Sequence, residues 1–187
     1  MYKNALVVVD MVKDFTDPAG LVYYPPVSDI LPRIAEAVAE CRSAGFLIIF
    51  MRHCYRRDKY DKNLLAMRPN CIEGSGGEEL DPSMPVEDND YIIAKRRYSA
   101  FYGTDLDLVL REHGVENIVI AGTKTNCCIR ATVHDAYYNC YNIIVLSDCV
   151  ATDSQEVNAV HLDDIRKYFG RVMTTRELFA SIKEGFL

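Results

Sequence analysis

Two adjacent cysteines, Cys127 and Cys128, have the clearest potential for covalent chemistry in this chain. They stand in the stretch GTKTNCCIRATVHDA (122–136), which begins at the last residue of the apolar run NIVIAG. A thiolate is a strong nucleophile, and the N-terminus of a helix stabilises negative charge. If Thr125 or Asn126 caps a helix here, Cys128 falls in its first turn, which would lower its pKa and supply amides for an oxyanion. A buried, inert thiol is the alternative for either cysteine.

Two charged residues end other apolar runs. ALVVVD (5–10) ends in Asp10, and DYIIAK (90–95) ends in Lys95. Open parallel sheets bind ligands beyond the carboxyl ends of their strands, near the point where the strand order reverses. For the order 3-2-1-4-5-6 this point lies between the strands that end at Asp10 and Gly122, so Asp10 and the cysteines meet in one crevice. Lys95 must reach across an intervening strand to join them, and a solvated charge is its alternative role.

Apolar runs alternate with segments of helical spacing along the whole chain, as is typical of βαβ units. Strands are expected at 5–10, 46–51, 90–95, 117–122, 142–147 and 171–174. Helices are expected at 28–45, 105–114, 126–141, 154–170 and 175–186, with Ser28 or Asp29 capping the first and Ser154 the fourth. The alternation predicts an α/β protein with a three-layer α/β/α Rossmann-like fold. Its six-stranded parallel sheet has the order 3-2-1-4-5-6, within a single domain over residues 1–187.

Residues 52–89 interrupt this alternation with a long polar stretch that contains several glycines and prolines. Such loops in compact domains usually have a function or are mobile. We expect this one to be a lid over the site or an interface between subunits. Together with the stretch YYPP (23–26), which we expect to be exposed, it could serve the assembly of a homo-oligomer.

The composition restricts the partners. The chain has 187 residues and a net charge of −6, which argues against binding to a nucleic-acid backbone. No apolar segment is long enough to cross a membrane, and the N-terminus does not resemble a signal peptide. Seven cysteines without a C-x-x-C pair favour free thiols in a reducing cytoplasm. We therefore expect a cytoplasmic protein with neither nucleic acid nor membrane as a partner.

Three separated motifs resemble those of the isochorismatase-like cysteine hydrolase superfamily, which includes nicotinamidases, N-carbamoylsarcosine amidases and ureidoacrylate amidases. VVVDMVKDF (7–15) resembles the family segment Asp-Met-Gln-x-Asp-Phe. AKRRYSAFYGTDLDLVLRE (94–112) resembles its lysine motif, which is followed by Phe and Thr-x-Leu. AGTKTNCCIRATVHDA (121–136) resembles its cysteine block, Gly-x-x-Thr-x-x-Cys-Val-x-x-Thr-x-x-Asp-Ala. The resemblance covers nearly the whole chain.

The resemblance implies a role for each matching residue. Asp10 is the general base, Lys95 the charge partner and Cys128 the nucleophile, because the register of the third motif selects the second cysteine. A cis peptide bond between Thr123 and Lys124 is also implied. In the family this bond helps to direct two backbone N–H groups, here those of Lys124 and Cys128, at the oxyanion of a tetrahedral intermediate.

Departures from the family motifs bear on the substrate. Nicotinamidases bind a metal through an Asp-x-His and a later His, whereas the corresponding stretch MRHCYRRDKYD contains a single histidine, His53. Metal sites need three or four convergent ligands, so we place His53 on the polar surface and expect neither a metal nor another cofactor. Nicotinamide is accordingly disfavoured as the substrate.

The presence of the cysteine favours amide hydrolysis, because isochorismatases that cleave a vinyl ether often lack it. We expect a small carboxamide or N-carbamoyl compound to be cleaved through a thioester, with release of ammonia or an amine. Phe15 and Tyr98 are expected to line the pocket. Arg96, with Arg97 and Lys124 as further candidates, is expected to recognise a carboxylate on the substrate.

Two other functions remain open. One is the hydrolysis of an ether such as isochorismate. The other is a non-catalytic binding or redox-sensing protein that uses Cys127 and Cys128, although a disulfide between adjacent cysteines closes a strained ring. The assembly state and the physiological substrate do not follow from the sequence.

Overall fold

A parallel sheet of six strands forms the middle layer of the molecule, in the predicted order β3-β2-β1-β4-β5-β6. The structure is a computed structural model that describes residues 2–185; the predicted closing helix runs to Phe186, which lies outside this range. The strands are β1 (Asn4–Val9), β2 (Leu47–His53), β3 (Tyr91–Lys95), β4 (Asn117–Thr123), β5 (Asn142–Ala151) and β6 (Arg171–Met173).

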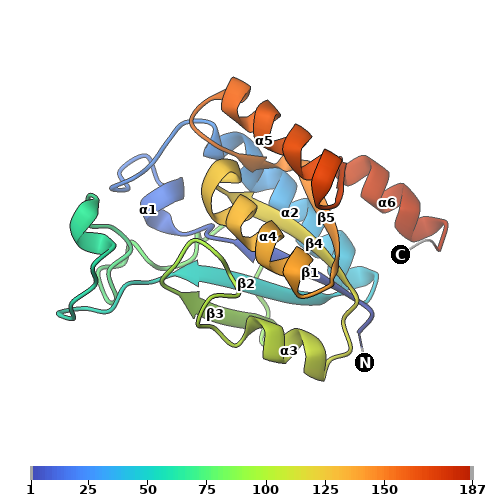
Figure 1. The fold of residues 1–187 in the computed structure, drawn as a ribbon, viewed down its shortest axis with the longest axis horizontal. Helices are drawn as coiled ribbons and strands as arrows, with labels where there is room; N and C mark the ends of the chain where they lie inside the picture. Colours follow the sequence, from blue (N-terminus) through green and yellow to red (C-terminus); the bar gives the residue numbers. More distant parts are fainter. Residues whose placement is uncertain (1, 186–187) are drawn as a thin grey trace.

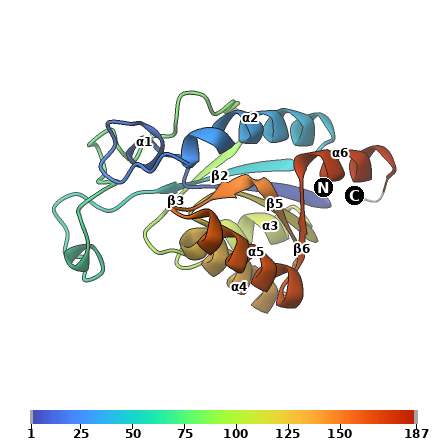
Figure 2. The same cartoon turned by 90° about the horizontal axis from the view of Figure 1, so that it is seen from above.

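Helices cover both faces of this sheet, as the βαβ alternation predicts. On one face lie α2 (Val27–Ser43) and α6 (Thr175–Lys183); on the other lie α3 (Leu106–Glu112), α4 (Arg130–Tyr138) and α5 (Gln155–Tyr168) (Figures 1 and 2). Three short helical turns complete the secondary structure: α1 (Lys13–Thr16), the 3₁₀ turn η1 (Leu64–Ala66) and the π turn η2 (Thr125–Ile129). The first two escaped prediction because each is too short to show a periodic apolar pattern.

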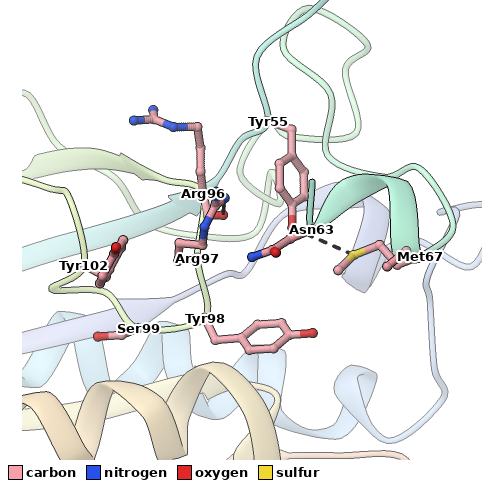
Figure 3. Close-up of a pocket in the computed structure, with 9 residues that line it drawn as sticks. Tyr55, Asn63, Met67, Arg96, Arg97, Tyr98, Ser99 and Tyr102 are labelled. Atoms are coloured by element: carbon pink, nitrogen blue, oxygen red, sulfur yellow. Dashed lines mark hydrogen bonds between the residues drawn. The ribbon is translucent and has the colours of Figure 1, made fainter. Parts of the chain in front are cut away.

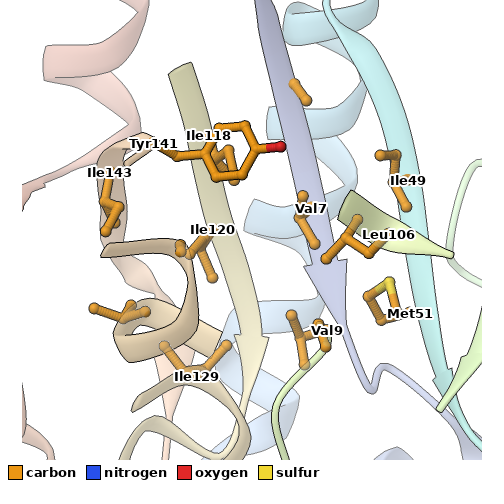
Figure 4. Close-up of a cluster of buried hydrophobic side chains, with 14 of the residues drawn as sticks. Val7, Val9, Ile49, Met51, Leu106, Ile118, Ile120, Ile129, Tyr141 and Ile143 are labelled. Carbon is orange, nitrogen blue, oxygen red and sulfur yellow. The ribbon is translucent and has the colours of Figure 1, made fainter. Parts of the chain in front are cut away.

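The strand β1 shows why its sequence is apolar at every position. Val7 and Val9 belong to the core between the sheet and α3, α4 and α5, whereas Leu6 and Val8 belong to the core beneath α2 and α6. Figure 4 shows Val7 and Val9 among the side chains of the first core. Because successive side chains of a strand point to opposite faces, a strand covered on both sides must be apolar throughout.

A glycine holds the carboxyl ends of β1 and β4 together. Gly122 pairs with Val9 and has a backbone φ of 118°, a conformation that L side chains rarely adopt. A Cβ atom at this position would lie 2.0 Å from the carbonyl oxygen of Val9. The close approach brings Asp10, which follows β1, beside the turn that leads from β4 to Cys128.

One of the expected helix caps is wrong and another is confirmed. The helix α2 begins at Val27 with Pro26 at its N-cap position, so neither Ser28 nor Asp29 caps it. The hydroxyl of Ser154 accepts a hydrogen bond from the backbone N–H of Val157 and caps α5, as predicted. The strand β5 also continues four residues beyond its expected end.

The long segment 52–89 packs partly against α1 at the carboxyl end of the sheet (Figure 1). The buried carboxylate of Asp14 accepts hydrogen bonds from the backbone N–H groups of Cys71 (2.6 Å) and Leu21 (3.2 Å). Val12 and Leu80 form an isolated β-bridge nearby. Part of the segment is therefore fixed beside the site rather than detached from the fold.

The expected exposure of the stretch 23–26 is wrong for Tyr24. This ring is 4% exposed, and its hydroxyl donates to the carbonyl oxygen of Ala151 (3.1 Å) and contacts the hydroxyl of Thr123. Tyr24 thus packs against the ends of β4 and β5. Within residues 2–185, no helix combines the length and the apolar character that crossing a bilayer requires.

Candidate active site

Lys95 brings the three predicted catalytic residues together. Its side chain is fully buried, and its Nζ lies 2.7 Å from Oδ2 of Asp10 and 3.4 Å from Sγ of Cys128. Lys95 is the last residue of β3, so its stem spans the width of β2 to reach the residue that follows β1. Lys95 therefore crosses the intervening strand, as the sequence analysis predicted.

The ammonium of Lys95 donates three hydrogen bonds. Its acceptors are Sγ of Cys128 at 3.4 Å, Nδ1 of His53 at 3.1 Å and the carbonyl oxygen of Arg97 at 2.9 Å. The ammonium also contacts Oδ2 of Asp10 at 2.7 Å, the shortest of its four contacts, in a charge-assisted ion pair. The other carboxylate oxygen of Asp10, Oδ1, has no hydrogen-bond partner within residues 2–185. The carboxylate can therefore take up a proton.

Asp10 is held in an unusual backbone conformation. Its φ is 58°, in the left-handed region, and its backbone N–H donates to the carbonyl oxygen of Met51 at 2.9 Å. Such conformations are infrequent outside glycine, although aspartate tolerates them better than most residues. They cluster at functional sites, where the surrounding structure maintains them.

Burial and charge compete in setting the pKa values of the ion pair. Burial alone would raise the pKa of Asp10, but the positive charge of Lys95, with a smaller contribution from His53, lowers it below its ordinary value. For Lys95, burial alone would lower the pKa, and the charges of Asp10 and Cys128 raise it above its ordinary value. The carboxylate and the ammonium are therefore both ionised at neutral pH.

The structure overturns the expectation of a low thiol pKa for Cys128. Burial raises the pKa of Cys128, and the positive charge of Lys95 only partly offsets this effect while the negative charge of Asp10 adds to it. Since Asp10 already balances the charge of Lys95, a thiolate would leave a net negative charge in a closed site. The resting sulfur is a thiol beside an ionised base.

The turn before Cys128 also differs from the expected capped helix. The chain enters a π turn at Thr125, and no side chain caps it. Asn126 Oδ1 instead accepts a hydrogen bond from the hydroxyl of Thr152 at 2.7 Å, and the buried hydroxyl of Thr125 has no partner within residues 2–185. The peptide bond between Thr123 and Lys124 is cis.

His53 was expected on the polar surface, and this expectation is wrong. The residue is 3% exposed, and its Nδ1 lies 3.6 Å from Oδ2 of Asp10 as well as 3.1 Å from Nζ of Lys95. Nδ1 of His53 therefore contacts both members of the ion pair. The sequence contained a usable signal, since extending the strand 46–51 by two residues places His53 at the same sheet edge as Lys95.

Three side chains of this cluster are of types that bind metals. Atoms of Asp10, His53 and Cys128 all lie within 4.8 Å of one another. The ammonium of Lys95 lies among them, at 2.7, 3.1 and 3.4 Å respectively. A positive charge at this position opposes the binding of a divalent cation, so these residues do not fit a metal while Lys95 is charged.

A cavity of about 210 Å³ opens beside the sulfur of Cys128. Phe15 and Tyr98, two of the predicted substrate contacts, line it together with Tyr55, which the sequence did not single out. The backbone turn that carries Lys124 and Cys128 forms another part of its wall. The cavity is large enough for an amide group with a short substituent.

Of the three cations expected to recognise a substrate carboxylate, two already pair with carboxylates of this chain and the third lines a different cavity. Arg97 forms an ion pair with Asp61 at 2.9 Å, and Lys124 forms one with Asp153 at 2.7 Å. Arg96 does not line the cavity at Cys128; it lines a neighbouring cavity. Its guanidinium extends away from the ring of Tyr98 (Figure 3).

The comparison with known families decides the affiliation of the chain. Residues 4–177 match the Isochorismatase domain. The chain belongs to the isochorismatase family. This agrees with the three motifs that the sequence analysis identified, since all of them lie inside the matched region.

Individual relatives of this isochorismatase-family protein are hydrolases or are related to hydrolases. A probable inactive nicotinamidase of Arabidopsis thaliana is 33% identical, with 93% of each chain covered. Maleamate amidohydrolase of Pseudomonas putida is 25% identical, with 97% of this chain and 87% of its own covered. The solved structure of a cysteine hydrolase from Pseudomonas syringae superposes with a TM-score of 0.93 at 31% identity, covering 97% of this chain and 93% of that one.

Proposed function

We propose that this isochorismatase-family protein is a cysteine-dependent amidohydrolase that cleaves a small carboxamide or N-carbamoyl compound. The observation that carries the proposal is the position of Lys95, whose Nζ contacts both Oδ2 of Asp10 and Sγ of Cys128 at the wall of a cavity. A base, a cation and a nucleophile within contact distance are what covalent acyl transfer requires. The amidohydrolase among the relatives supports the same reaction class.

In the first half of the proposed cycle, Asp10 takes the proton of the Cys128 thiol as the sulfur attacks the carbonyl carbon. Lys95 compensates the negative charge that moves from the carboxylate to the sulfur and then to the substrate oxygen. The backbone N–H groups of Lys124 and Cys128 bind this oxyanion. When the C–N bond breaks, protonated Asp10 gives its proton to the leaving nitrogen, and a thioester on Cys128 remains.

In the second half, water enters and Asp10 accepts one of its protons as the oxygen attacks the thioester carbon. The S–C bond then breaks, the acid product leaves, and the proton on Asp10 returns to the sulfur. The lowered pKa of Asp10 keeps it ionised at the start of both halves. The raised pKa of Cys128 explains why the sulfur needs this base within reach.

The proposal is tested by a panel of small amides and ureido acids, scored for release of ammonia by the purified protein. Replacing Cys128 by Ala should lower the turnover at least about a thousandfold without loss of folding, because the covalent route is removed. The matched control is Cys140→Ala, since Cys140 is an exposed thiol outside the cavity. Equal activity in the two variants would exclude the covalent mechanism. Pyruvate release from isochorismate, measured in parallel, would point to ether cleavage instead.

A non-catalytic binding role is the second candidate, because one relative is named as a probable inactive nicotinamidase. In that case, no member of the amide panel is turned over. The adjacent thiols Cys127 and Cys128 both line the cavity and would then be free to act as a redox pair. Mass spectrometry of the protein after mild oxidation would detect loss of two hydrogens in this pair.

We also propose that the protein assembles as a homo-oligomer through the outer part of the segment 52–89. Tyr60 and Leu65 of this segment are 81% and 73% exposed, the highest exposures among the large apolar side chains of residues 2–185. Light scattering of the wild type and of a Tyr60→Ser, Leu65→Ser double variant tests this. The wild type is expected at a multiple of the 21.2 kDa chain mass and the double variant at a lower molar mass; a monomeric wild type would contradict the proposal.

A further inference from the structure

A second, larger cavity lies next to the one at Cys128. Its volume is about 640 Å³, and it shares the walls Tyr55, Met67 and Tyr98 with the catalytic cavity of about 210 Å³ (Figure 3). Small-molecule sites usually measure about 300–1,000 Å³. The catalytic cavity alone is below that range, and the two cavities together are within it. The shared residues place the two cavities side by side, so a substrate bound at Cys128 lies next to the outer cavity.

The walls of the outer cavity are mainly aromatic. Tyr55, Tyr98 and Tyr102 contribute three phenol rings, and Met67 contributes a thioether that accepts a hydrogen bond from the hydroxyl of Tyr55 at 3.8 Å. Figure 3 shows Tyr98 and Tyr55 on two sides of the space toward which Met67 points. Aromatic and thioether walls pack well against a flat apolar group, because both groups bury much area and are polarisable.

One of the two arginines that line the outer cavity is already neutralised by other groups. The guanidinium of Arg97 donates to Asp61 at 2.9 Å and to the carbonyl oxygen of Arg96 at 2.6 Å, so its charge is already balanced. The guanidinium of Arg96 extends away from Tyr98 (Figure 3). The hydroxyl of Ser99 donates to Asp135 rather than into the cavity. Because phenol rings and a thioether supply much of these walls, an uncharged aromatic tail suits them.

We propose that the outer cavity is a subsite for an uncharged aromatic group, and that the preferred substrates are aryl-bearing carboxamides whose carbonyl carbon reaches Cys128. This inference rests on the proposed amidohydrolase function and names its substrate class. It makes Tyr102 a determinant of specificity, because this residue lines the outer cavity but not the inner one.

The kinetic test compares propionamide with 4-phenylbutyramide, measured by ammonia release. The wild type should have the higher kcat/KM for the aryl amide. Tyr102→Ala should lower the ratio of the two values about tenfold, as expected for the loss of one aromatic contact. Tyr138→Ala is the matched control, since Tyr138 is 69% exposed against 68% for Tyr102 and lies on α4, away from both cavities. Its ratio should equal that of the wild type. Equal ratios in all three proteins would overturn the inference.

A binding test separates failure of the subsite from failure of the proposed function. In the Cys128→Ala background, calorimetry with 4-phenylbutyramide should show a dissociation constant about tenfold higher with Tyr102→Ala than with Tyr138→Ala. If the wild type hydrolyses no amide, the proposed function fails, and this measurement still decides whether the subsite exists. Equal dissociation constants contradict the subsite. A change of molar mass on Tyr102→Ala without a change in selectivity would mean that the cavity is a protein contact.

Discussion

Two lysine–aspartate pairs with the same separation occupy different parts of the candidate site. Nζ of Lys95 lies 2.7 Å from Asp10 at the closed end of the cavity, and Nζ of Lys124 lies 2.7 Å from Asp153 at its rim. Both side chains of the first pair are fully buried, whereas those of the second are 22% and 60% exposed. The contact distance is equal, so the difference between the pairs arises from their surroundings.

The exposed pair Lys124–Asp153 tolerates the loss of one partner because solvent can hydrate the other. The buried pair Lys95–Asp10 does not, because no solvent reaches it. At the rim, solvent screens both charges and can hydrate either partner alone. In the closed end, each charge depends on the other, because an unpaired ion in a dry site has lost its hydration without compensation. The ion pair Lys124–Asp153 therefore has a structural role only. In the proposed function, the ion pair Lys95–Asp10 has a chemical role.

The largest effect should follow from breaking the buried pair. Replacing Lys95 by Met leaves the carboxylate of Asp10 unpaired and is expected to lower the free energy of unfolding by about 3–5 kcal/mol. Ammonia release should also be lost, because nothing then balances the charge on the sulfur. Urea denaturation and the amide assay measure the two effects separately.

A double variant sharpens this result. Combining Lys95→Met with Asp10→Asn removes both charges, so most of the lost stability should return while activity stays absent. Recovery of activity together with stability would show that the pair is structural only. Asn is suitable at position 10 because it tolerates the left-handed backbone conformation of Asp10.

A pH series should show the next largest effect. The pKa of Asp10 is lower in the folded protein than in the unfolded chain, so its stabilising contribution is complete above the ordinary aspartate pKa of about 3.9. It is lost as the pH falls through the lower, folded-state value. The stability difference between the wild type and the Asp10→Asn, Lys95→Met double variant, which has neither charge, should thus be constant from pH 7 to pH 5 and shrink below about pH 4. A difference that grows on acidification would contradict the ion pair.

A smaller effect is expected from His53, which acts through its neighbours as a positioning residue. His53→Leu removes an acceptor from Lys95 and should lower kcat about tenfold with little change in KM. Because His53 helps to lower the pKa of Asp10, the acidic limb of the kcat/KM profile should also move to higher pH. His53→Asn, whose amide can accept from Lys95 and donate to Asp10, should restore both. A purely structural role would leave the profile in place.

The smallest effect is expected from the rim pair. Lys124→Met should change the free energy of unfolding by about 1 kcal/mol or less, since exposed ion pairs contribute little. The backbone N–H of residue 124 remains in this variant, so kcat should stay within about twofold of the wild type. A loss as large as that of Lys95→Met would remove the distinction between the two pairs.

The fold followed from the sequence because its signals are local. Each strand carries a short apolar run, and the alternation with helical spacing leaves few possible topologies. The expected order of the strands is confirmed. The details that were missed depend on tertiary contacts: Tyr24 is buried through its contacts with Thr123 and Ala151, and Asn126 bonds to Thr152 instead of capping a helix.

The site was predictable only in part. The positions of Asp10, Lys95 and Cys128 at strand ends and in family motifs were sufficient to place them together. The burial of His53 beside them and the raised pKa of Cys128 could not be predicted. Both depend on how completely the folded chain excludes water from the site. Burial is a property of the whole fold, and no single motif encodes it.

The three hydrogen bonds of Lys95 make the geometry of its cation as important as the charge. Its tetrahedral ammonium directs N–H bonds toward a sulfur, an imidazole nitrogen and a carbonyl oxygen that lie in different directions. A guanidinium carries the same charge in a flat fork, suited to acceptors that lie in one plane. Arginine is therefore no substitute at position 95, and sequence comparisons that treat the two basic residues as equivalent would overlook a change that disables this centre.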